Sequence, residues 1–218
     1  MEKRHVVIIG NAGAARECHW MLGEVIPREP DLAFKGFLAF EGYAGDLRGL
    51  SHLRLGSDDD YAAAPGDVFV IGIGLPALRA KAWAKWKERG ASFINLIHPA
   101  CFMAKDICVG EGNIITPACS FSCNVTVGNA NYFNGGVVLG HDARIGDANY
   151  FGTYSMIAGN ALVGSRNSFG VGAVALERTK IGSDNTIAPG AIVYKGCGDG
   201  RLMAGNPALD ISGTRPAM

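Results

Sequence analysis

The sequence predicts two parts, a small α/β lobe built on parallel strands and, after it, an all-β coil of short stacked strands. Strand-like apolar runs that alternate with helix-like runs predict the lobe. A six-residue repeat predicts the coil: every sixth residue from Met103 to Val193 is apolar, 16 positions in a chain that is 48% hydrophobic. Chance gives such a run in one chosen phase roughly once in 10^5 cases, so the repeat is a property of the fold.

A second repeat, 18 residues long, indicates the shape of the coil. Asparagines recur with this spacing at Asn113, Asn131, Asn149, Asn167 and Asn185, and apolar-glycine pairs recur at Val109-Gly110, Val127-Gly128, Ile145-Gly146, Val163-Gly164 and Ile181-Gly182. Eighteen residues are three sixes, which is one circuit of a three-sided coil. Each side is then a short strand, and coils stack about 4.8 Å apart. Each corner needs a residue that enters the left-handed backbone region cheaply, as Asn and Gly do.

Length and pattern divide the 218 residues into three segments. We expect a Rossmann-like α/β domain over 1–97, a β-helix of about five coils over 98–195, and a C-terminal tail over 196–218. In the first domain the expected elements are strands over 5–10, 34–40, 68–71 and 93–97, a helix of about ten residues ending near Gly23, and a helix from Pro76 to about Gly90. The acidic run 58–60 is expected to cap a short helix over 61–64.

Composition argues against several kinds of partner. Lys plus Arg and Asp plus Glu number 20 each and no basic cluster is present, so nucleic acid and anionic membranes are not expected partners. The first apolar run is too short for a signal peptide or a membrane span, and we expect a cytoplasmic, reducing location. Cys101 and Cys119 share a core-facing phase, so packing explains them. There is no C-x-x-C pair, and Cys119 with Cys123 is too little for a metal site.

The expected lobe offers a ligand site at the carboxyl ends of its strands. The turn from Gly10 to Gly13 leads into a helix whose first N–H groups suit a phosphate or another anion. This G-x-x-G pattern is not the G-x-G-x-x-G of dinucleotide binding. We therefore expect a nucleotide attached to a substrate rather than a dinucleotide cofactor.

One histidine lies inside the repeats. His141 stands two residues past inward-facing Leu139, which predicts a place on an outer wall of the coil. A neutral imidazole can accept a proton from a nucleophile, and the adjacent Asp142 can orient it. Cys123 lies one coil before His141 and Gly159 one coil after it. The Gly159 N–H suits an oxygen that gains negative charge, although a structural corner glycine is an equally simple explanation.

The order of elements carries a resemblance. A Rossmann-like lobe, then Asn95-Leu-Ile-His98-Pro99, then about five coils and finally Ala204-Gly-Asn-Pro-Ala208 resembles one group of hexapeptide-repeat enzymes. The group comprises the sialic-acid O-acetyltransferases and the bacterial amino-sugar N-acetyltransferases that act on UDP-bacillosamine precursors and GDP-perosamine. The resemblance implies a left-handed parallel β-helix and a homotrimer. It also implies acetyl-CoA in the groove between adjacent β-helices and an acceptor that reaches in from the lobe.

The resemblance also implies roles for individual residues. The family's catalytic pair falls on His141 and Asp142. Its acetyl-CoA contacts fall on Tyr150, Gly159, Val171, Gly172, Pro189, Gly205 and Asn206. Tyr150 stands where the family frequently has a histidine. Gly205 and Asn206 would lie near the far end of the CoA.

The lobe departs from the family pattern. The acceptor-binding positions fall on Gly10, Ala12, Gly13, Ala14, Ala39, Phe40 and Gly74. Ala14 stands where the family has a histidine, and Ala39 and Phe40 stand where it has paired aspartates. Leu75 replaces an Asn or Asp, whereas Arg79 keeps its place. Each loss removes a polar group that would grip a nucleotide-sugar.

The function expected on this basis is acetyl-CoA-dependent acetylation of an amino group on a sugar. We expect this sugar to be linked to a nucleotide. His141 is the general base, attack on the thioester is direct, and no metal takes part. Surface-polysaccharide biosynthesis is the family's setting. The alternatives are sugar O-acetylation of the sialic-acid type, a catalytically silent trimeric binding module, and a zinc hydratase like the γ-type carbonic anhydrases. The hydratase is disfavoured because it needs three converging histidines, and four of the five precede the coil.

Overall fold

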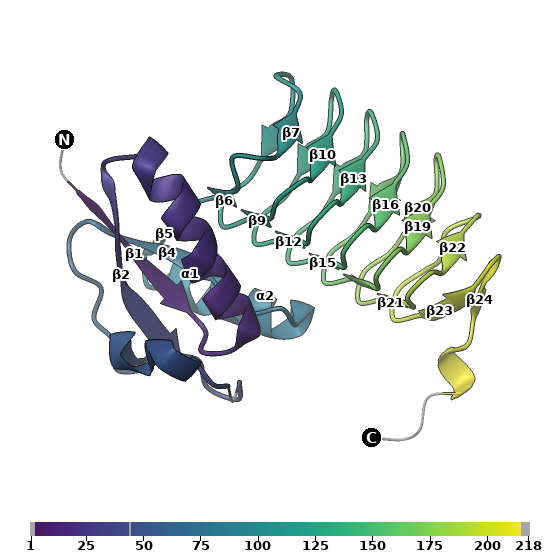
Figure 1. Cartoon of the computed structure of the whole chain (residues 1–218). Helices are drawn as coiled ribbons and strands as arrows, with labels where there is room; N and C mark the ends of the chain where they lie inside the picture. Colours follow the sequence, from purple (N-terminus) through teal and green to yellow (C-terminus); the bar gives the residue numbers. More distant parts are fainter. Residues whose placement is uncertain (1–2, 44, 215–218) are drawn as a thin grey trace.

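The computed structural model describes residues 3–43 and 45–214 and shows an α/β lobe beside a long β-helix (Figure 1). The lobe is a parallel five-stranded sheet in the order β3-β2-β1-β4-β5. Its elements are β1 (Arg4–Ile9), α1 (Gly13–Val25), η1 (Ile26–Arg28), β2 (Leu32–Ala39), η2 (Arg48–Leu53), β3 (Arg54–Ser57), β4 (Asp67–Ile71), α2 (Pro76–Glu88) and β5 (Ser92–Phe93). α1 packs with one set of alternating residues of β1 and α2 with the other, so the two helices cover opposite faces of the sheet.

The lobe differs from the sequence-based expectations in three places. Residues 61–64 form no helix, because the buried Asp58 carboxylate is engaged by the Lys85 ammonium at 2.5 Å and cannot act as a cap. β3 was not predicted, since this edge strand is half exposed and lacks an apolar run. The expected strand over 93–97 is divided: β5 ends in the lobe, whereas β6 (Leu96–Ile97) pairs with the coil. We therefore propose that the coil begins at Leu96.

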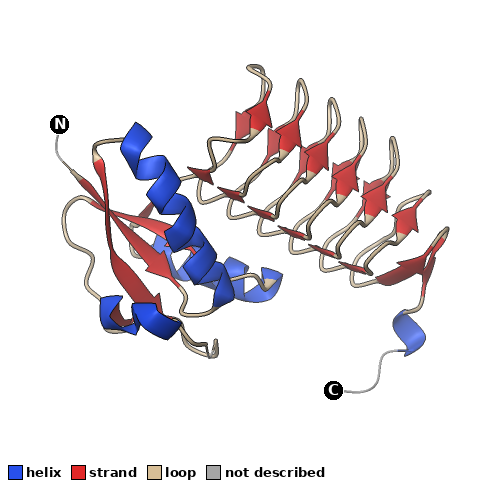
Figure 2. Cartoon of the chain, in the orientation of Figure 1, coloured by secondary structure: helices blue, strands red, loops and turns tan. Residues whose placement is uncertain are grey.

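The second part is the expected left-handed β-helix, with strands on three sides and no helix within the coils (Figure 2). After β6 its strands are β7 (Phe102–Met103), β8 (Cys108–Val109), β9 (Ile114–Ile115), β10 (Ser120–Phe121), β11 (Thr126–Val127), β12 (Tyr132–Phe133), β13 (Val138–Leu139), β14 (Arg144–Ile145), β15 (Tyr150–Phe151), β16 (Met156–Ile157), β17 (Leu162–Val163), β18 (Ser168–Phe169), β19 (Val174–Ala175), β20 (Lys180–Ile181), β21 (Thr186–Ile187) and β22 (Ile192–Val193). β23 (Leu202–Gly205) and β24 (Ala208–Asp210) close the far end as a hairpin, and η3 (Ser212–Thr214) follows.

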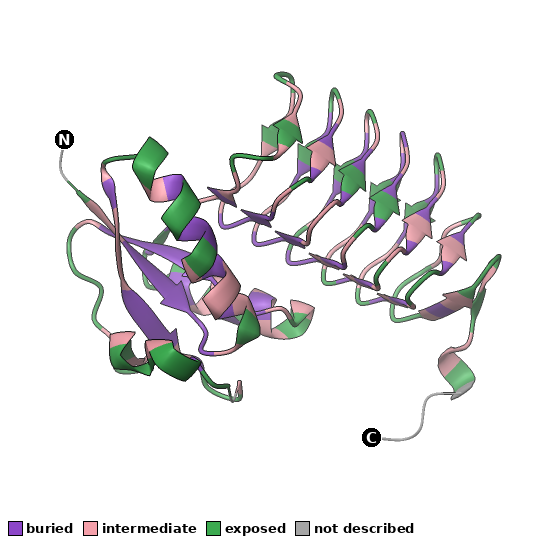
Figure 3. Cartoon of the chain, in the orientation of Figure 1, coloured by how far each residue is buried: buried purple, intermediate pink, exposed green. Residues whose placement is uncertain are grey.

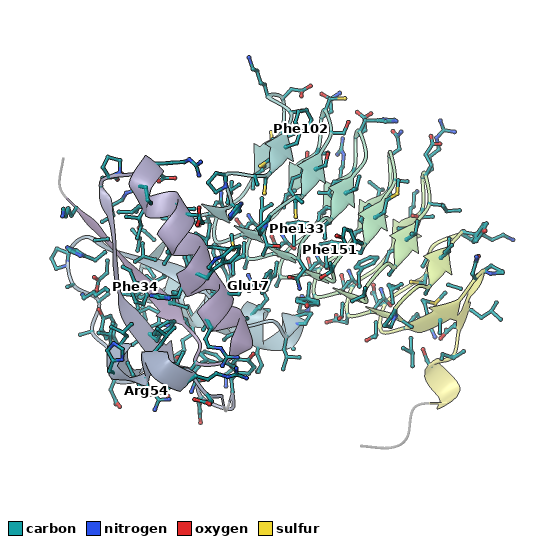
Figure 4. The ribbon with its side chains drawn as sticks, in the orientation of Figure 1. Glu17, Phe34, Arg54, Phe102, Phe133 and Phe151 are labelled. Carbon is teal, nitrogen blue, oxygen red and sulfur yellow. The ribbon has the colours of Figure 1, made fainter. Side chains whose placement is uncertain are left out.

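Every third strand belongs to the same sheet. We name each sheet after its first strand: the β6 sheet (β6, β9, β12, β15, β18, β21, β23, β24), the β7 sheet (β7, β10, β13, β16, β19, β22) and the β8 sheet (β8, β11, β14, β17, β20). The pairing register is 18 residues between the strands from β6 to β22, as for Phe121 with Leu139, and 16 residues between β21 and β23. The six-residue positions fill the interior, where Phe133 and Phe151 stack 4.7 Å apart between ring centroids (Figure 4).

The corners of the coil are left-handed, as expected, but the repeated asparagines do not occupy them. Every sixth residue from Gly112 to Gly196 takes a φ between 54° and 83°. The five repeated asparagines are not these residues, because each lies one position after a corner. Their buried side chains form a ladder instead: Asn131 Nδ2 donates to Asn113 Oδ1 at 3.1 Å, and Asn131 Oδ1 accepts from Asn149 Nδ2 at 3.0 Å. The ladder runs along one edge of the coil and holds the corners there that are not glycine, such as Ala130, in a costly conformation.

The lobe is packed against the outer face of the β6 sheet. Cys18, Met21 and Leu22 of α1 share one buried cluster with Ile114 and Tyr132 of the coil. The Tyr132 hydroxyl donates a short hydrogen bond to Glu17, which lies on the side of α1 that faces the β-helix (Figure 4). None of the helices in the described part of the chain is long and apolar enough to cross a membrane.

The asparagine ladder gives a test of what holds the coil together. Asn131→Ala removes side-chain bonds to three neighbours and leaves the Gly146 carbonyl and the Asn149 N–H without their partner. Buried unpaired groups are costly, so we expect a loss of about 3 kcal/mol in the free energy of unfolding, measured by denaturant titration. The control Thr126→Ala, on an exposed strand position, should change it by less than about 0.5 kcal/mol. Equal effects of the two changes would contradict a structural role for the ladder.

Candidate functional site

His141 and Asp142 lie at a corner of the coil, between β13 of the β7 sheet and β14 of the β8 sheet. Asp142 is the left-handed corner residue, with φ 59°, and this turn brings its carboxylate back toward its neighbour. His141 Nδ1 lies 2.8 Å from Asp142 Oδ2, and both side chains are about half exposed. When Nδ1 carries the proton and donates it to the carboxylate, Nε2 is left with a lone pair and can act as a base.

The environment of Asp142 keeps its carboxylate charged. The hydrogen bond from His141 holds the pKa of Asp142 below its ordinary value of 3.8, and a further hydrogen bond from Asn124, in the preceding coil, acts in the same direction. A carboxylate that stays ionised orients the imidazole and favours the imidazolium that forms when Nε2 takes a proton.

The His141 ring packs against Gly159, which lies one coil further along. The Asn160 N–H donates to the His141 carbonyl at 2.8 Å, which fixes the two coils in register. A Cβ at position 159 would lie 2.7 Å from His141 Nε2, so only glycine leaves the ring in place. Within the described residues the Gly159 N–H donates no hydrogen bond, which leaves it for a ligand oxygen. On the other side lies Cys123, whose thiol is exposed.

A second site lies between the lobe and the β6 sheet. A cavity of about 320 Å³ is lined by Tyr43, Gly74, Leu75, Pro76, Tyr150 and Ser168. It brings together Gly74, expected to bind the acceptor, and Tyr150, expected to bind acetyl-CoA. The Tyr150 hydroxyl accepts from Asn134 Nδ2 at 2.7 Å and keeps its own proton to donate. Burial raises the pKa of Tyr150, so that proton is retained.

The other expected acceptor residues lie along the carboxyl ends of β1 and β2, with differing access. Gly10 packs against the Gly72 carbonyl, which a Cβ would approach to 2.4 Å. Ala12, Gly13 and Ala14 form the turn and the first residues of α1, and Ala39 ends β2. Gly45 lies close against Ala12, so the loop after β2 partly covers this turn.

Phe40 differs from the other expected acceptor residues, because its side chain is only 3% exposed. It packs in the lobe core with Leu38 and Ile73, so its ring does not reach a surface ligand.

The expected acetyl-CoA residues occupy two different edges of the prism. Val171 and Gly172 follow β18, and Pro189 follows β21, which puts them at the corner between the β6 and β7 sheets. Gly159 lies at the corner between the β7 and β8 sheets. Gly205 and Asn206 lie in the β23–β24 hairpin. One chain by itself therefore does not bring these residues together.

Sequence reasoning missed the groups that join the lobe to the coil. Arg79 is fully buried and bonds only backbone carbonyls, so it does not reach an acceptor. Glu17 with Tyr132 and Lys87 with Glu111 form further contacts. The one available signal was the 18-residue spacing of Tyr132 and Tyr150, two aromatic residues at an outward position. Over residues 3–43 and 45–214, no three His, Cys, Asp or Glu side chains are grouped as metal ligands.

The contact between Gly159 and the imidazole can be tested directly. Gly159 has an ordinary backbone conformation, so Gly159→Ala strains nothing except the His141 ring. We expect a crystal structure of this variant to have the ring rotated away and the bond to Asp142 broken. Gly135→Ala is the matched control, because its nearest contact would be 3.6 Å away. An unmoved His141 in Gly159→Ala would refute the packing argument.

Comparisons with solved structures agree with the fold and with the order of the two parts. PerB from Caulobacter crescentus, in complex with CoA and GDP-perosamine, superposes with a TM-score of 0.80 at 27% identity over 94% of this chain and 96% of that one. The perosamine N-acetyltransferase of the same organism, with a histidine replaced by asparagine and the same two molecules bound, matches at 26% identity with a TM-score of 0.80 over the same shares.

Two further solved structures support the fold alone. The acetyltransferase domain of PglB from Neisseria gonorrhoeae has a TM-score of 0.84 at 18% identity, and WeeI from Acinetobacter baumannii has 0.81 at 21%. Each match covers 96% of this chain and 100% of the other one. No protein-family model and no curated protein sequence matches the chain. In its fold and its order of domains the chain is therefore similar to hexapeptide-repeat sugar N-acetyltransferases, which is the resemblance that its sequence pattern predicted.

Proposed function

We propose that this protein transfers the acetyl group of acetyl-CoA to an amino group of a nucleotide-linked sugar, with His141 as general base. One observation carries the proposal: an imidazole whose Nδ1 is held by a charged carboxylate and whose ring rests on a glycine with a free N–H. The likeness to a protein solved with CoA and GDP-perosamine supports the choice of donor and acceptor.

The reaction needs one base and one oxyanion donor. The acceptor amine attacks the thioester carbonyl carbon as His141 Nε2 takes its proton, and the Asp142 carboxylate stabilises the resulting imidazolium. The carbonyl oxygen becomes an oxyanion that the Gly159 N–H can stabilise. The tetrahedral intermediate then expels the CoA thiolate, which takes from the imidazolium the proton that the amine gave up. No acyl-enzyme forms.

Assembly completes the site in this proposal. Gly159 and His141 stand at one edge of the prism, whereas Val171, Gly172, Pro189 and the lobe cavity stand at or beyond another. A homotrimer in which neighbouring coils lie side by side would combine the two edges, with acetyl-CoA in the groove between them. The outer face of the β7 sheet suits such contact, because its outward residues are mostly apolar and partly exposed (Figure 3): Phe102, Ser120, Val138, Met156, Val174 and Ile192.

The acceptor is assigned to the lobe. Its sugar would enter the cavity beside Gly74 and Tyr150, and a nucleotide would extend along the turn from Gly10 to Ala14 toward Ala39. Every side chain that lines the cavity is uncharged, so stacking and hydroxyl hydrogen bonds would hold the sugar. All six cysteines are unpaired, which fits the reducing cytoplasm to which we assign the reaction.

The experiment that tests this function measures CoA release from acetyl-CoA with a panel of UDP- and GDP-linked amino sugars and free sialic acid. Products are identified by mass spectrometry, which separates N- from O-acetylation. We expect one amino sugar to gain an acetyl group, and His141→Ala to lose about 10²- to 10⁴-fold of that rate. Cys123→Ser should keep the rate, because no cysteine acts as nucleophile. A fully active His141→Ala, or a wild type that does not bind acetyl-CoA, would overturn the proposal.

The charge of Asp142 gives a pH prediction. Because its pKa is lowered, its carboxylate is ionised at every pH above that lowered value and loses its charge only below it. Asp142→Asn should therefore reduce the rate by about tenfold over the whole range from about pH 5 to about pH 8. Glu177→Gln is the matched control, since Glu177 lies two coils further at the same edge and pairs with Arg178. A loss confined to one end of this range would contradict the assignment.

A further inference from the structure

Arg79 of α2 is a buried guanidinium that joins the lobe to the β-helix. On the lobe side its Nη1 donates to the Ile71 and Ile73 carbonyls, both at 2.7 Å. On the coil side its Nε donates to the Ala130 carbonyl at 2.8 Å and its Nη2 to the Asn131 carbonyl at 3.2 Å. The side chain is 0% exposed, so these four bonds are made away from water.

The partners of this cation are unusual. Within the described residues Arg79 forms no ion pair, and the Tyr132 ring, 5.4 Å from the guanidinium carbon, is one of the neighbours that stabilise its charge. Burial lowers the pKa of Arg79 to about 10, so the group remains charged at neutral pH. A buried charge tolerates the loss of few hydrogen bonds. The four carbonyls must therefore keep their spacing, which ties the position of the lobe to that of the coil.

The residues that Arg79 holds lie next to the two walls of the cavity between lobe and coil. Ile73 immediately precedes Gly74, and Asn131 immediately precedes Tyr132, whose ring meets that of Tyr150 edge to face at 5.5 Å. Gly74 and Tyr150 face each other, since a Cβ on Gly74 would lie 3.7 Å from the Tyr150 ring.

A planar guanidinium is better suited than a lysine ammonium to binding carbonyls of the lobe and of the coil at the same time. The guanidinium directs its donors in fixed directions and spans both pairs of carbonyls at once. A lysine at the same place would keep the charge but would concentrate it at one point.

We propose that Arg79 is a positioning residue that sets the spacing between Gly74 and Tyr150, and thereby the width of the acceptor cavity, without touching the acceptor. This inference rests on the proposed function, because it takes the cavity as the acceptor site.

The kinetic test uses Arg79→Lys, with Arg79→Gln as a second variant in case the first does not fold. We expect kcat/KM for the acceptor to fall on the order of tenfold or more, through a higher KM for the acceptor, with the KM for acetyl-CoA unchanged. Arg89→Lys is the matched control. The Arg89 guanidinium also donates to a backbone carbonyl, that of Asp58 at 2.7 Å, but this bond lies within the lobe and does not reach the coil.

A second measurement does not depend on turnover. Hydrogen–deuterium exchange should be faster over residues 71–76 and 130–132 in the Arg79 variants, and unchanged there in Arg89→Lys. An unchanged acceptor KM, or equal rises in both KM values, would overturn the inference, as would unchanged exchange. If the wild type acetylates no acceptor, the proposed function fails, and exchange alone decides whether Arg79 fixes the spacing.

Discussion

The left-handed backbone at every sixth residue is the constraint on which the rest of the structure depends. It bends the chain at regular intervals, so that three strands of two residues close one circuit and each residue lies against the one 18 positions away. The position of His141 over Gly159 follows from that count. The asparagine ladder supplies the energetic support, because its hydrogen bonds hold corners occupied by alanine, arginine and aspartate, for which this conformation is unfavourable.

Much of the fold of the coil could be predicted from the sequence, because a repeat is read directly from the residue positions and does not require weighing one interaction against another. The inward positions, the 18-residue register and the isolated histidine gave the β-helix and the neighbours of His141. The corners were assigned to the wrong residues, because Asn is favoured both by left-handed backbone and by buried amide hydrogen bonds. Only the structure distinguishes these two roles of asparagine. Asp58 was misassigned for a similar reason, since a long-range partner, Lys85, outcompeted a local cap.

The contacts between the two bodies were beyond sequence reasoning. Arg79, Glu17 and Tyr132 are far apart in the chain, and none belongs to a periodic pattern that points to the others. They matter because the cavity is made of one wall from each body, and neither wall is a site alone. In the proposed function the chemistry of the coil and the choice of acceptor are thus physically separate: the repeat would position the base, and the docking of the lobe would shape the acceptor pocket.

The regular count also limits how this chain can vary in length. A single residue gained or lost inside a strand of the coil would shift every later position out of phase, turning inward side chains outward and parting His141 from Gly159. Whole circuits, or loops that bulge from a corner, leave the phase intact. Natural insertions and deletions should therefore cluster at corners and at the two ends, and the segment between Cys123 and Gly159 should be the part of the gene least tolerant of either.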